Sequence, residues 1–412
     1  MFFIQNERVF FNLISFICAC VIPLLISGPF LPDLLLSTLS LWFLFYSLKK
    51  KNYIIYENRY FLIFFAFCCV CIVSSLLSEN KIFSLKSSLF YIRIGIFALL
   101  ISYLIEKKTD ILDYFYYIFL ITFSILNFDG YLQFLTGHNI LGFPMHPARV
   151  SSFFNEKLIL GSYLSRLFPL FLALFLTRNK KKKLEIFYFF FLFFFTDVLV
   201  FLSGERASFV FFNVSSVFII FFISEYKKLR LLLFFLVYFF ITIIIFNNKL
   251  IYERYITSVA SHLKLDRQDA KFVFFSDIHD GYARTSINMF LDKPVLGHGP
   301  NSFRIKCADP KYGVGPAPCN THPHNFYFQL AAETGIIGLS FLFGLLIFFL
   351  YLMCKCIFKN VFFKKKCLSD YKICLLAGLL ITIWPLTTNG NFFNNHLMLL
   401  YSIQMGFFVK NL

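Results

Sequence analysis

The chain has 412 residues, of which 58% are hydrophobic and only 15% are charged, and its formal net charge is +17 at pH 7. A soluble domain of this length would be about one quarter charged, so the composition excludes a water-soluble globule. It does not indicate a nucleic-acid partner either, because most lysines and arginines stand in short clusters between apolar runs, as in the cytoplasmic loops of membrane proteins. The clusters are 49–51, 107–108, 178–183, 227–230 and 364–366.

Apolar runs of about 17–20 residues, the length that an α-helix needs to cross a bilayer, recur along nearly the whole chain. They predict an all-α integral membrane protein that forms one polytopic domain over residues 1–412. No small-residue cleavage pattern follows the first run, so we expect a retained helix there rather than a signal peptide. In chain order, about twelve transmembrane helices are expected near residues 9–27, 32–48, 60–77, 89–105, 111–133, 158–177, 186–202, 207–223, 231–246, 330–354, 373–388 and 397–410.

The basic clusters also predict an orientation, because cytoplasmic loops carry an excess of lysine and arginine. Each odd span leaves from a basic cluster and each even span returns to one, so both termini are expected in the cytoplasm. Three loops then face the extracytoplasmic side: roughly 134–157, the short turn at 203–208 and a segment at 247–324. The last has nearly 80 residues, and loops of that length are commonly functional. Within it, we expect an amphipathic surface helix over 266–291, followed by Gly- and Pro-rich turns over 292–303.

Nine of the eleven cysteines lie within or beside apolar runs and are expected to behave as small buried hydrophobic residues. None of them has histidine partners at zinc spacing, so a metal site is not expected. Cys307 and Cys319 differ because they share one polar loop on the side expected to be oxidising. A disulfide between them would close that loop just before His324, and two free thiols remain the alternative.

Arginines on the extracytoplasmic face are candidates for binding phosphate, because arginine presents a planar and permanently charged fork. Arg206 stands in the tight turn between two spans, Arg284 on the expected surface helix, and Arg149 before the sixth span. Each of them alone could simply contact water or lipid headgroups. Together they would suit a lipid-linked phosphate or pyrophosphate.

Two charged residues stand inside expected spans, Arg166 in the sixth and Asp197 in the seventh. Adjacent antiparallel helices would bring them to similar depth, and charges within a membrane usually pair or line a cavity. The sequence leaves both a structural ion pair and a substrate contact open.

His324 stands where the long loop enters the tenth span. Thr321 as a helix cap and Pro323 in the first turn would place His324 in the first turn of that helix. The positive end of a helix disfavours imidazolium, so the ring would be neutral and able to act as a base. The alternative is an ordinary histidine at the membrane interface.

At 100° per residue, Gly335 and Gly338 would fall on the same helical face as His324, with Glu333 on the opposite face. Small residues on that face would let a neighbouring helix or a lipid chain approach closely. The glycines could equally serve packing alone.

His324 and Asn325, followed after nine residues by Gly335-x-x-Gly338, resemble the signature of the bacterial O-antigen ligase family, which includes polysaccharide polymerases and protein O-oligosaccharyltransferases. Three other segments are similar to elements of that family: 203–212 with its arginine-bearing turn, 283–303 with an arginine and a closing Pro-x-x-Gly-x-Gly turn, and 149–164. In the last, Glu156 follows Asn155 where the family often has Asn-Pro. The similarity covers about the second half of the chain.

This resemblance implies a GT-C-like architecture and a reaction at the periplasmic face of the bacterial inner membrane. A glycan would pass from undecaprenyl diphosphate to a sugar hydroxyl of lipid A–core, with inversion and without a metal or another cofactor. By position, His324 would be the general base, and Arg206 and Arg284, with Arg149, would bind the diphosphate. Asn325, Gly335 and Gly338 would be supporting motif residues.

Two alternatives remain open from the sequence. A polymerase or a protein O-oligosaccharyltransferase would use the same chemistry with another acceptor, and only the lack of a separate large periplasmic domain favours the ligase. A flippase or transporter would also suit about twelve spans, but transporters usually place their site at the bilayer midplane. Here the distinctive polar residues gather on one face, which favours chemistry at the membrane surface.

Overall fold

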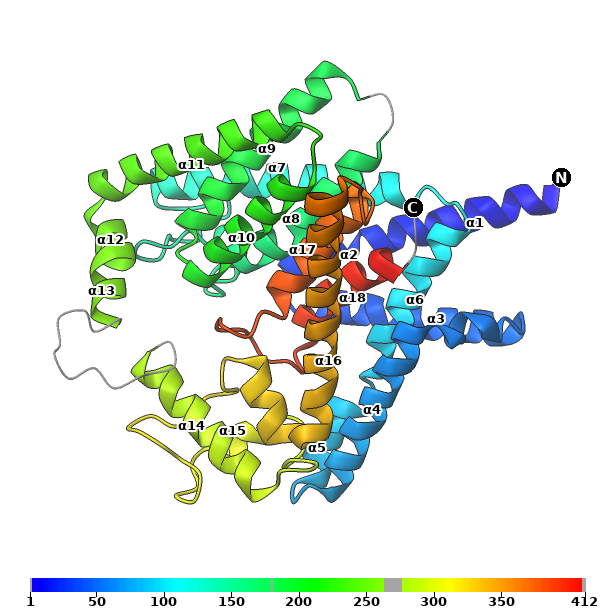
Figure 1. Ribbon diagram of the computed structural model, residues 1–412, viewed down its shortest axis with the longest axis vertical. Helices are drawn as coiled ribbons and strands as arrows, with labels where there is room; N and C mark the ends of the chain where they lie inside the picture. The colour runs from blue at the N-terminus through cyan, green and yellow to red at the C-terminus, as the bar shows by residue number, and fades with distance from the viewer. Residues whose placement is uncertain (1, 179–180, 263–275, 410–412) are drawn as a thin grey trace.

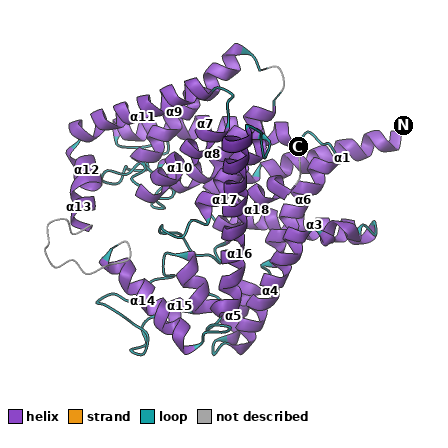
Figure 2. Ribbon diagram, viewed as in Figure 1, coloured by secondary structure: helices purple, strands orange, loops and turns teal. Residues whose placement is uncertain are grey.

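The structure is a computed structural model that describes residues 2–178, 181–262 and 276–409. Within those residues the protein consists of helices and loops, without a β-strand (Figure 2). The expected all-α membrane class is therefore confirmed. Of the surface helix expected over 266–291, residues 266–275 lie outside the described part, and helix α14 (Asp277–Asp292) covers the remainder.

Nine helical segments in the described part are long and apolar enough to cross a membrane. They are the run of α1 (Phe2–Ala19), α2 (Val21–Leu24) and η1 (Leu25–Ser27), then α3 (Phe30–Lys49), α4 (Arg59–Leu77), the pair α5 (Lys81–Ser88) and α6 (Ile92–Glu106), α7 (Ile111–Thr136), α8 (Leu160–Thr177), α9 (Lys183–Leu202), α11 (Lys227–Asn247) and α16 (Phe326–Phe363).

The other three expected spans coincide with shorter helices, α10 (Arg206–Phe222), α17 (Asp370–Thr382) and α18 (Asn395–Val409). These have 17, 13 and 15 residues. Each of the expected apolar runs thus forms a helix, but the count of about twelve complete crossings, like the orientation of the termini, remains a prediction.

Helix α8 lies at the centre of the bundle, and nearly all of its side chains are buried. It packs against α7, α9, α10 and α17 (Figure 1). Phenylalanine rings fill its contact with α9, where Phe175 stacks on Phe189 with ring centroids 3.9 Å apart and Phe168 lies 5.1 Å from Phe193. Lipid tails are as apolar as these rings, so close packing, rather than exclusion of water, holds α8 in place.

The long connection between α11 and α16 carries short helices outside the bundle. These are α12 (Lys249–Tyr252), the π-helical turn η4 (Glu253–Thr257), α13 (Ser258–His262), α14, and α15 (Phe303–Lys306). Helices α14 and α15 pack against the first part of α16, at the end of the molecule where α4 and α5 meet (Figure 1). We call residues 276–325 the α14 lobe.

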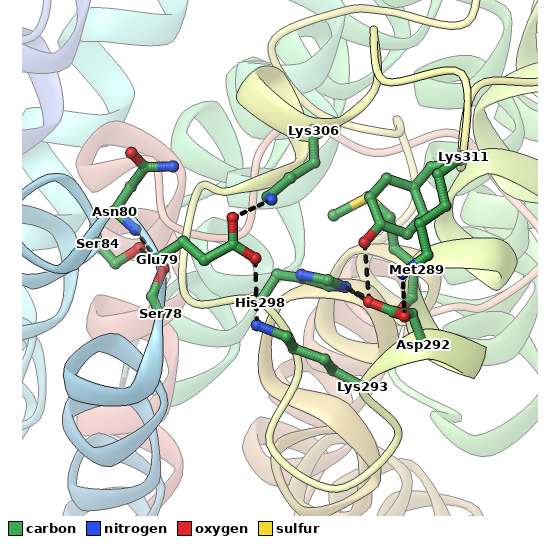
Figure 3. Close-up of polar contacts among 11 residues, drawn as sticks. Ser78, Glu79, Asn80, Ser84, Met289, Asp292, Lys293, His298, Lys306 and Lys311 are labelled. Carbon is green, nitrogen blue, oxygen red and sulfur yellow. Dashed lines mark hydrogen bonds and ion pairs between the residues drawn. The ribbon is translucent and has the colours of Figure 1, made fainter.

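Ion pairs join the α14 lobe to the end of α4 (Figure 3). Glu79, in the turn after α4, contacts the ammonium group of Lys293 at 3.4 Å and also that of Lys306. Within the lobe, Asp292 lies 3.6 Å from Nε2 of the buried His298. Exposed ion pairs contribute at most about 1 kcal/mol each, so these contacts mainly orient the Gly- and Pro-rich segment between α14 and α15.

Helix α16 is broken at Gly335, which has φ 62° and ψ −164°. The turn at 294–297 enters the break, and the backbone N–H of Ile336 donates to the carbonyl of Pro294 at 2.8 Å. A Cβ atom on Gly335 would lie 2.4 Å from the carbonyl carbon of Val295. Both the positive φ and this close approach require glycine at position 335.

The expected continuous helical face below His324 is therefore wrong. The break at Gly335 turns the chain, and the space at Gly335 is occupied by backbone of the 294–297 turn rather than by another helix or a lipid. At Gly338, an added Cβ would collide with the side chain of Thr334. The two glycines therefore serve local backbone and side-chain packing on either side of the break.

Candidate active site

A cavity of about 930 Å³ opens where several segments expected on the extracytoplasmic side meet. It is bounded by the end of the 134–157 loop, the start of α8, the turn between α9 and α10, the α14 lobe and the loop before α18. Three residues singled out from the sequence line it: His324, Arg206 and Arg166. Its charged and histidine lining residues are Glu156, Lys157, Arg166, Glu205, Arg206, Arg254, His279, His322, His324 and His396.

His324 precedes α16 and is not part of its first turn. Its φ of 57° lies in the left-handed region, and the helix begins two residues later at Phe326. The helix cap is Asn325, so the expectation that Thr321 caps the helix and that Pro323 belongs to its first turn is wrong. An Asn side chain satisfies the free N–H groups of a helix start at least as well as Thr does, and here it lies four residues later.

Asn325 connects the start of α16 to the loop between α17 and α18. Its Oδ1 atom accepts hydrogen bonds from the N–H groups of Tyr327, at 2.9 Å, and Phe328, at 3.3 Å. Its Nδ2 atom donates to the carbonyls of Pro385, at 2.8 Å, and Thr387, at 3.1 Å. This buried amide thus uses both of its ends to fix the backbone that follows His324.

The ring of His324 lies in a cluster of aromatic and polar side chains. Its centroid is 4.1 Å from that of His322, 5.4 Å from that of His279 and 5.8 Å from that of Tyr282. Its Nε2 atom lies 3.1 Å from the amide nitrogen of Asn320. Because an amide nitrogen only donates, this contact suits an unprotonated ring nitrogen.

Two of the clustered histidines are held neutral. Burial, together with a smaller effect of the nearby His279, lowers the pKa of His324 to about 4. Burial and the neighbouring His324 lower the pKa of His322 to about 3. A neutral imidazole can accept a proton, which is the property that a general base requires.

Arg206 is the first residue of α10 and lines the cavity at a helix N-terminus, where backbone N–H groups and the helix dipole favour anions. The adjacent Glu205 does not pair with it. The Glu205 carboxylate accepts from the N–H groups of Gly161, at 2.7 Å, and Ser162, at 3.2 Å, and so caps α8 instead. Among the described residues, no ion pair involves Arg206.

Arg254 is a lining residue that the sequence did not reveal. It stands in η4, and its Nε and NH2 atoms donate to the carbonyl of Gly204 at 2.9 Å and 2.5 Å. Burial lowers the pKa of Arg254, and the charges of Arg149 and Arg206 lower this pKa further, so the three guanidinium groups lie near one another. Nothing in the local pattern distinguishes Arg254 from other arginines of the long loop.

Arg149 and Arg284 do not line the cavity. Arg149 donates to the carbonyls of Ser203 and Leu158, both at 3.2 Å, and so braces the turn that carries Arg206. Arg284 lies on α14, where its Nε atom is 2.7 Å from a carboxylate oxygen of Asp280. The structure therefore brings Arg206 and His324 to one cavity, which Arg149 and Arg284 do not line.

The loop before His324 is closed by a disulfide between Cys307 and Cys319. Cys307 is buried in a small apolar cluster of the α14 lobe that also contains Tyr282 and Phe303. The bridge ties the chain that leads to His324 to the end of α15, which packs in the same cluster as Tyr282, one of the rings against which His324 packs.

Glu333 is a buried residue that does not line the cavity and instead holds the segment after α14. Its two carboxylate oxygens accept from the N–H groups of Asn301, at 2.9 Å, and Phe303, at 3.0 Å. The side chain of Gln329 donates to it at 3.0 Å. Charged residues within apolar helices are rarely unpaired. This rule could have predicted that Glu333 binds a partner, which here is the backbone of the turn after α14.

The possible ion pair between Arg166 and Asp197 does not form. The Asp197 carboxylate accepts from the side chain of Asn213, at 3.4 Å, whereas Arg166 lines the cavity. The described residues also contain no group of three or more His, Cys, Asp and Glu side chains arranged to hold a metal ion.

Comparison with known proteins shows a similarity over part of the chain. No curated protein matches the sequence. The family model described as O-antigen ligase matches residues 187–343, a range that contains Arg206, Arg284, His324 and both motif glycines. Residues 187–343 are thus similar to the O-antigen ligase family.

Proposed function

We propose that the protein transfers a glycan from undecaprenyl diphosphate to a sugar hydroxyl of lipid A–core, at the periplasmic face of the bacterial inner membrane. The observation that carries this proposal is the single cavity lined by both a neutral histidine, His324, and an arginine at a helix N-terminus, Arg206. The match of residues 187–343 to the O-antigen ligase family model supports a glycosyl-transfer reaction on a lipid-linked glycan. The donor, the acceptor and the residue roles are the proposal.

In the proposed step, the acceptor hydroxyl oxygen attacks the anomeric carbon of the glycan. The bond from that carbon to the diphosphate oxygen breaks, and the diphosphate leaves with its electron pair. The hydroxyl proton moves to the ring of His324, and Arg206 stabilises the charge that develops on the leaving oxygens. Attack opposite to the leaving group inverts the anomeric configuration.

The low pKa of His324 fits this role once the donor is bound. A pKa of about 4 keeps the ring unprotonated but makes it a weak base. A diphosphate in the same cavity adds negative charge nearby, which favours the protonated ring and raises its pKa toward neutrality. The base is therefore activated when the donor occupies the site.

The test is transfer by purified protein in liposomes that contain undecaprenyl diphosphate-linked glycan and lipid A–core. The wild type is expected to produce glycan-bearing lipid A–core, and His324→Ala is expected to produce none. His138→Ala is a matched control, because His138 is an exposed histidine of the 134–157 loop that does not line the cavity. Normal transfer by His324→Ala would refute the assignment of the base.

The same assay separates the alternative functions. A polymerase would lengthen the glycan on undecaprenyl diphosphate whether or not lipid A–core is present, and a flippase would form no new glycosidic bond. Either product pattern would replace the ligase proposal.

A further inference from the structure

Arg166 is a buried cation that the proposed step has not used. It lies in the second turn of α8, only 3% of its surface is exposed, and it lines the same cavity as Arg206 and His324. Arginine does not lose its proton in proteins, so this residue keeps its positive charge inside the helical bundle.

The partners of Arg166 are neutral. Its NH1 atom donates to the side chain and the carbonyl of Ser162, and its NH2 atom lies 3.4 Å from Oδ1 of Asn389. The guanidinium also lies 5.2 Å from the centre of the Phe211 ring and beside the hydroxyl of Tyr401. Its Nε atom has no hydrogen-bond partner among the residues that the structure describes.

No carboxylate of the described residues forms an ion pair with Arg166. Glu205 is close enough to interact with it electrostatically, but the Glu205 oxygens accept from Gly161, Ser162 and Ser208. A buried charge without a countercharge is costly, so an anion that entered the cavity would be stabilised at Arg166.

The charge of the whole cavity fits one particular anion. Four lining residues are cationic and two are carboxylates, which leaves an excess of two positive charges while the histidines are neutral. The cations are Lys157, Arg166, Arg206 and Arg254, and the carboxylates are Glu156 and Glu205. A diphosphate that links a lipid to a sugar carries about two negative charges, one on each phosphate, and would neutralise this excess.

We infer that Arg166 is a second diphosphate-binding residue, which holds one phosphate of the donor while Arg206, at the start of α10, holds the other. The inference rests on the proposed function, since the diphosphate is the leaving group of the proposed donor. It assigns to Arg166 a role in binding, separate from the proton transfer assigned to His324.

Arg230 provides a matched control. It is also an arginine with 3% exposure inside the bundle, and it makes no ion pair with the described residues, but it does not line the cavity. Its NH2 atom donates to the carbonyls of Ile223, at 2.6 Å, and Glu225, at 2.8 Å. Replacing Arg230 by Gln therefore removes a buried arginine without touching the proposed binding site.

The experiment measures binding of farnesyl diphosphate, a short soluble lipid diphosphate, to the purified full-length protein by calorimetry. We expect Arg166→Gln to weaken binding about 10- to 100-fold, the usual range for losing hydrogen bonds to a charged group. Arg230→Gln should bind as the wild type does. Wild-type affinity in Arg166→Gln would overturn the inference.

Two further ligands identify the source of the anion, and a second variant covers the case in which Arg166→Gln does not fold. Farnesyl monophosphate should bind about tenfold or more weakly than the diphosphate, because it lacks the second phosphate. Equal competition by phosphatidylglycerol would mark a general lipid-headgroup site and overturn the assignment. If Arg166→Gln fails to fold, Arg166→Lys keeps the charge but loses the fork, and unchanged affinity in that variant would count against the inference.

The two proposals fail separately. If wild-type protein binds farnesyl diphosphate through Arg166 but forms no glycosidic bond in liposomes, the proposed reaction is wrong and the binding assignment stands. If the wild type transfers glycan and Arg166→Gln binds and transfers normally, the binding assignment is wrong and the proposed reaction stands.

Discussion

The backbone N–H of Asn389 donates a 2.7 Å hydrogen bond to the backbone carbonyl of His324. The same loop, between α17 and α18, also supplies the two carbonyls that receive the side chain of Asn325. The position of His324 therefore depends on a loop near the C-terminal end of the chain. A left-handed backbone at a non-glycine residue is strained and persists only where its surroundings hold it, and this loop provides the holding contacts.

Replacing Asn325 by Ala removes the cap of α16 and both bonds to this loop. We expect a loss of stability of about 1–3 kcal/mol and, because His324 is no longer held, a fall in the turnover rate at saturating donor. Asn58→Ala is the matched control, since Asn58 caps α4 through the N–H groups of Tyr60 and Phe61, away from the cavity. Equal turnover in the two variants, measured by glycan transfer, would contradict the positioning role.

Arg206→Lys keeps a positive charge but loses the planar fork. We expect kcat/KM for the lipid-linked donor to fall about 10- to 100-fold, because the charge-assisted hydrogen bonds to phosphate are lost. Arg149→Lys makes the same chemical change at a residue whose guanidinium donates to the carbonyls of Ser203 and Leu158. That variant should mainly lower thermal stability, and a larger loss of donor affinity in Arg149→Lys than in Arg206→Lys would reverse the two roles.

The buried histidines predict how stability depends on pH. Unfolded histidine titrates near pH 6.5, whereas the pKa of His324 is about 4 and that of His322 about 3 in the folded protein. The unfolded chain thus binds more protons below about pH 6.5, so stability should decrease as the pH falls through that window, by at most about 1.4 kcal/mol per pH unit for each group. Melting temperatures at successive pH values should fall less steeply in His322→Ala, and an unchanged slope would argue against the shift.

The disulfide between Cys307 and Cys319 spans 12 residues. A loop of that length corresponds to about 3 kcal/mol of stabilisation in the chain-entropy description. Replacing both cysteines by Ser should lower the melting temperature and reduce transfer at elevated temperature, because the chain leading to His324 is no longer closed. Cys354→Ser is the control, since Cys354 is free and exposed, and an equal effect of both changes would show that the bridge is dispensable.

The helices were predictable because a helix that crosses a bilayer needs a long apolar run, and such runs can be read directly from the sequence. The grouping of Arg206 with His324 was predictable too, since both stand in loops expected on one face. The start of α16 was not, because Thr321 and Asn325 are both suitable caps and only tertiary contacts to Pro385 and Thr387 select the second.

Other site residues depend on contacts between distant segments. A continuous helix through Gly335 was expected wrongly, because the left-handed backbone of Gly335 depends on its contact with the turn at 294–297. Arg254 reaches the cavity from a π-helical turn in the long loop, and no local pattern marks it. The sequence left an ion pair between Arg166 and Asp197 open, and only the tertiary structure shows that Asp197 accepts from Asn213 instead.

The break in α16 also makes the position of the backbone beside His324 independent of the thickness of the membrane. The part after the break, residues 336–363, is about 42 Å long at 1.5 Å per residue, longer than a hydrocarbon core of about 30 Å. A helix of this excess length tilts when the bilayer becomes thinner. The residues before Gly335 are held instead by the turn at 294–297 and by Glu333, so the inclination of the spanning part changes while the backbone beside His324 keeps its place.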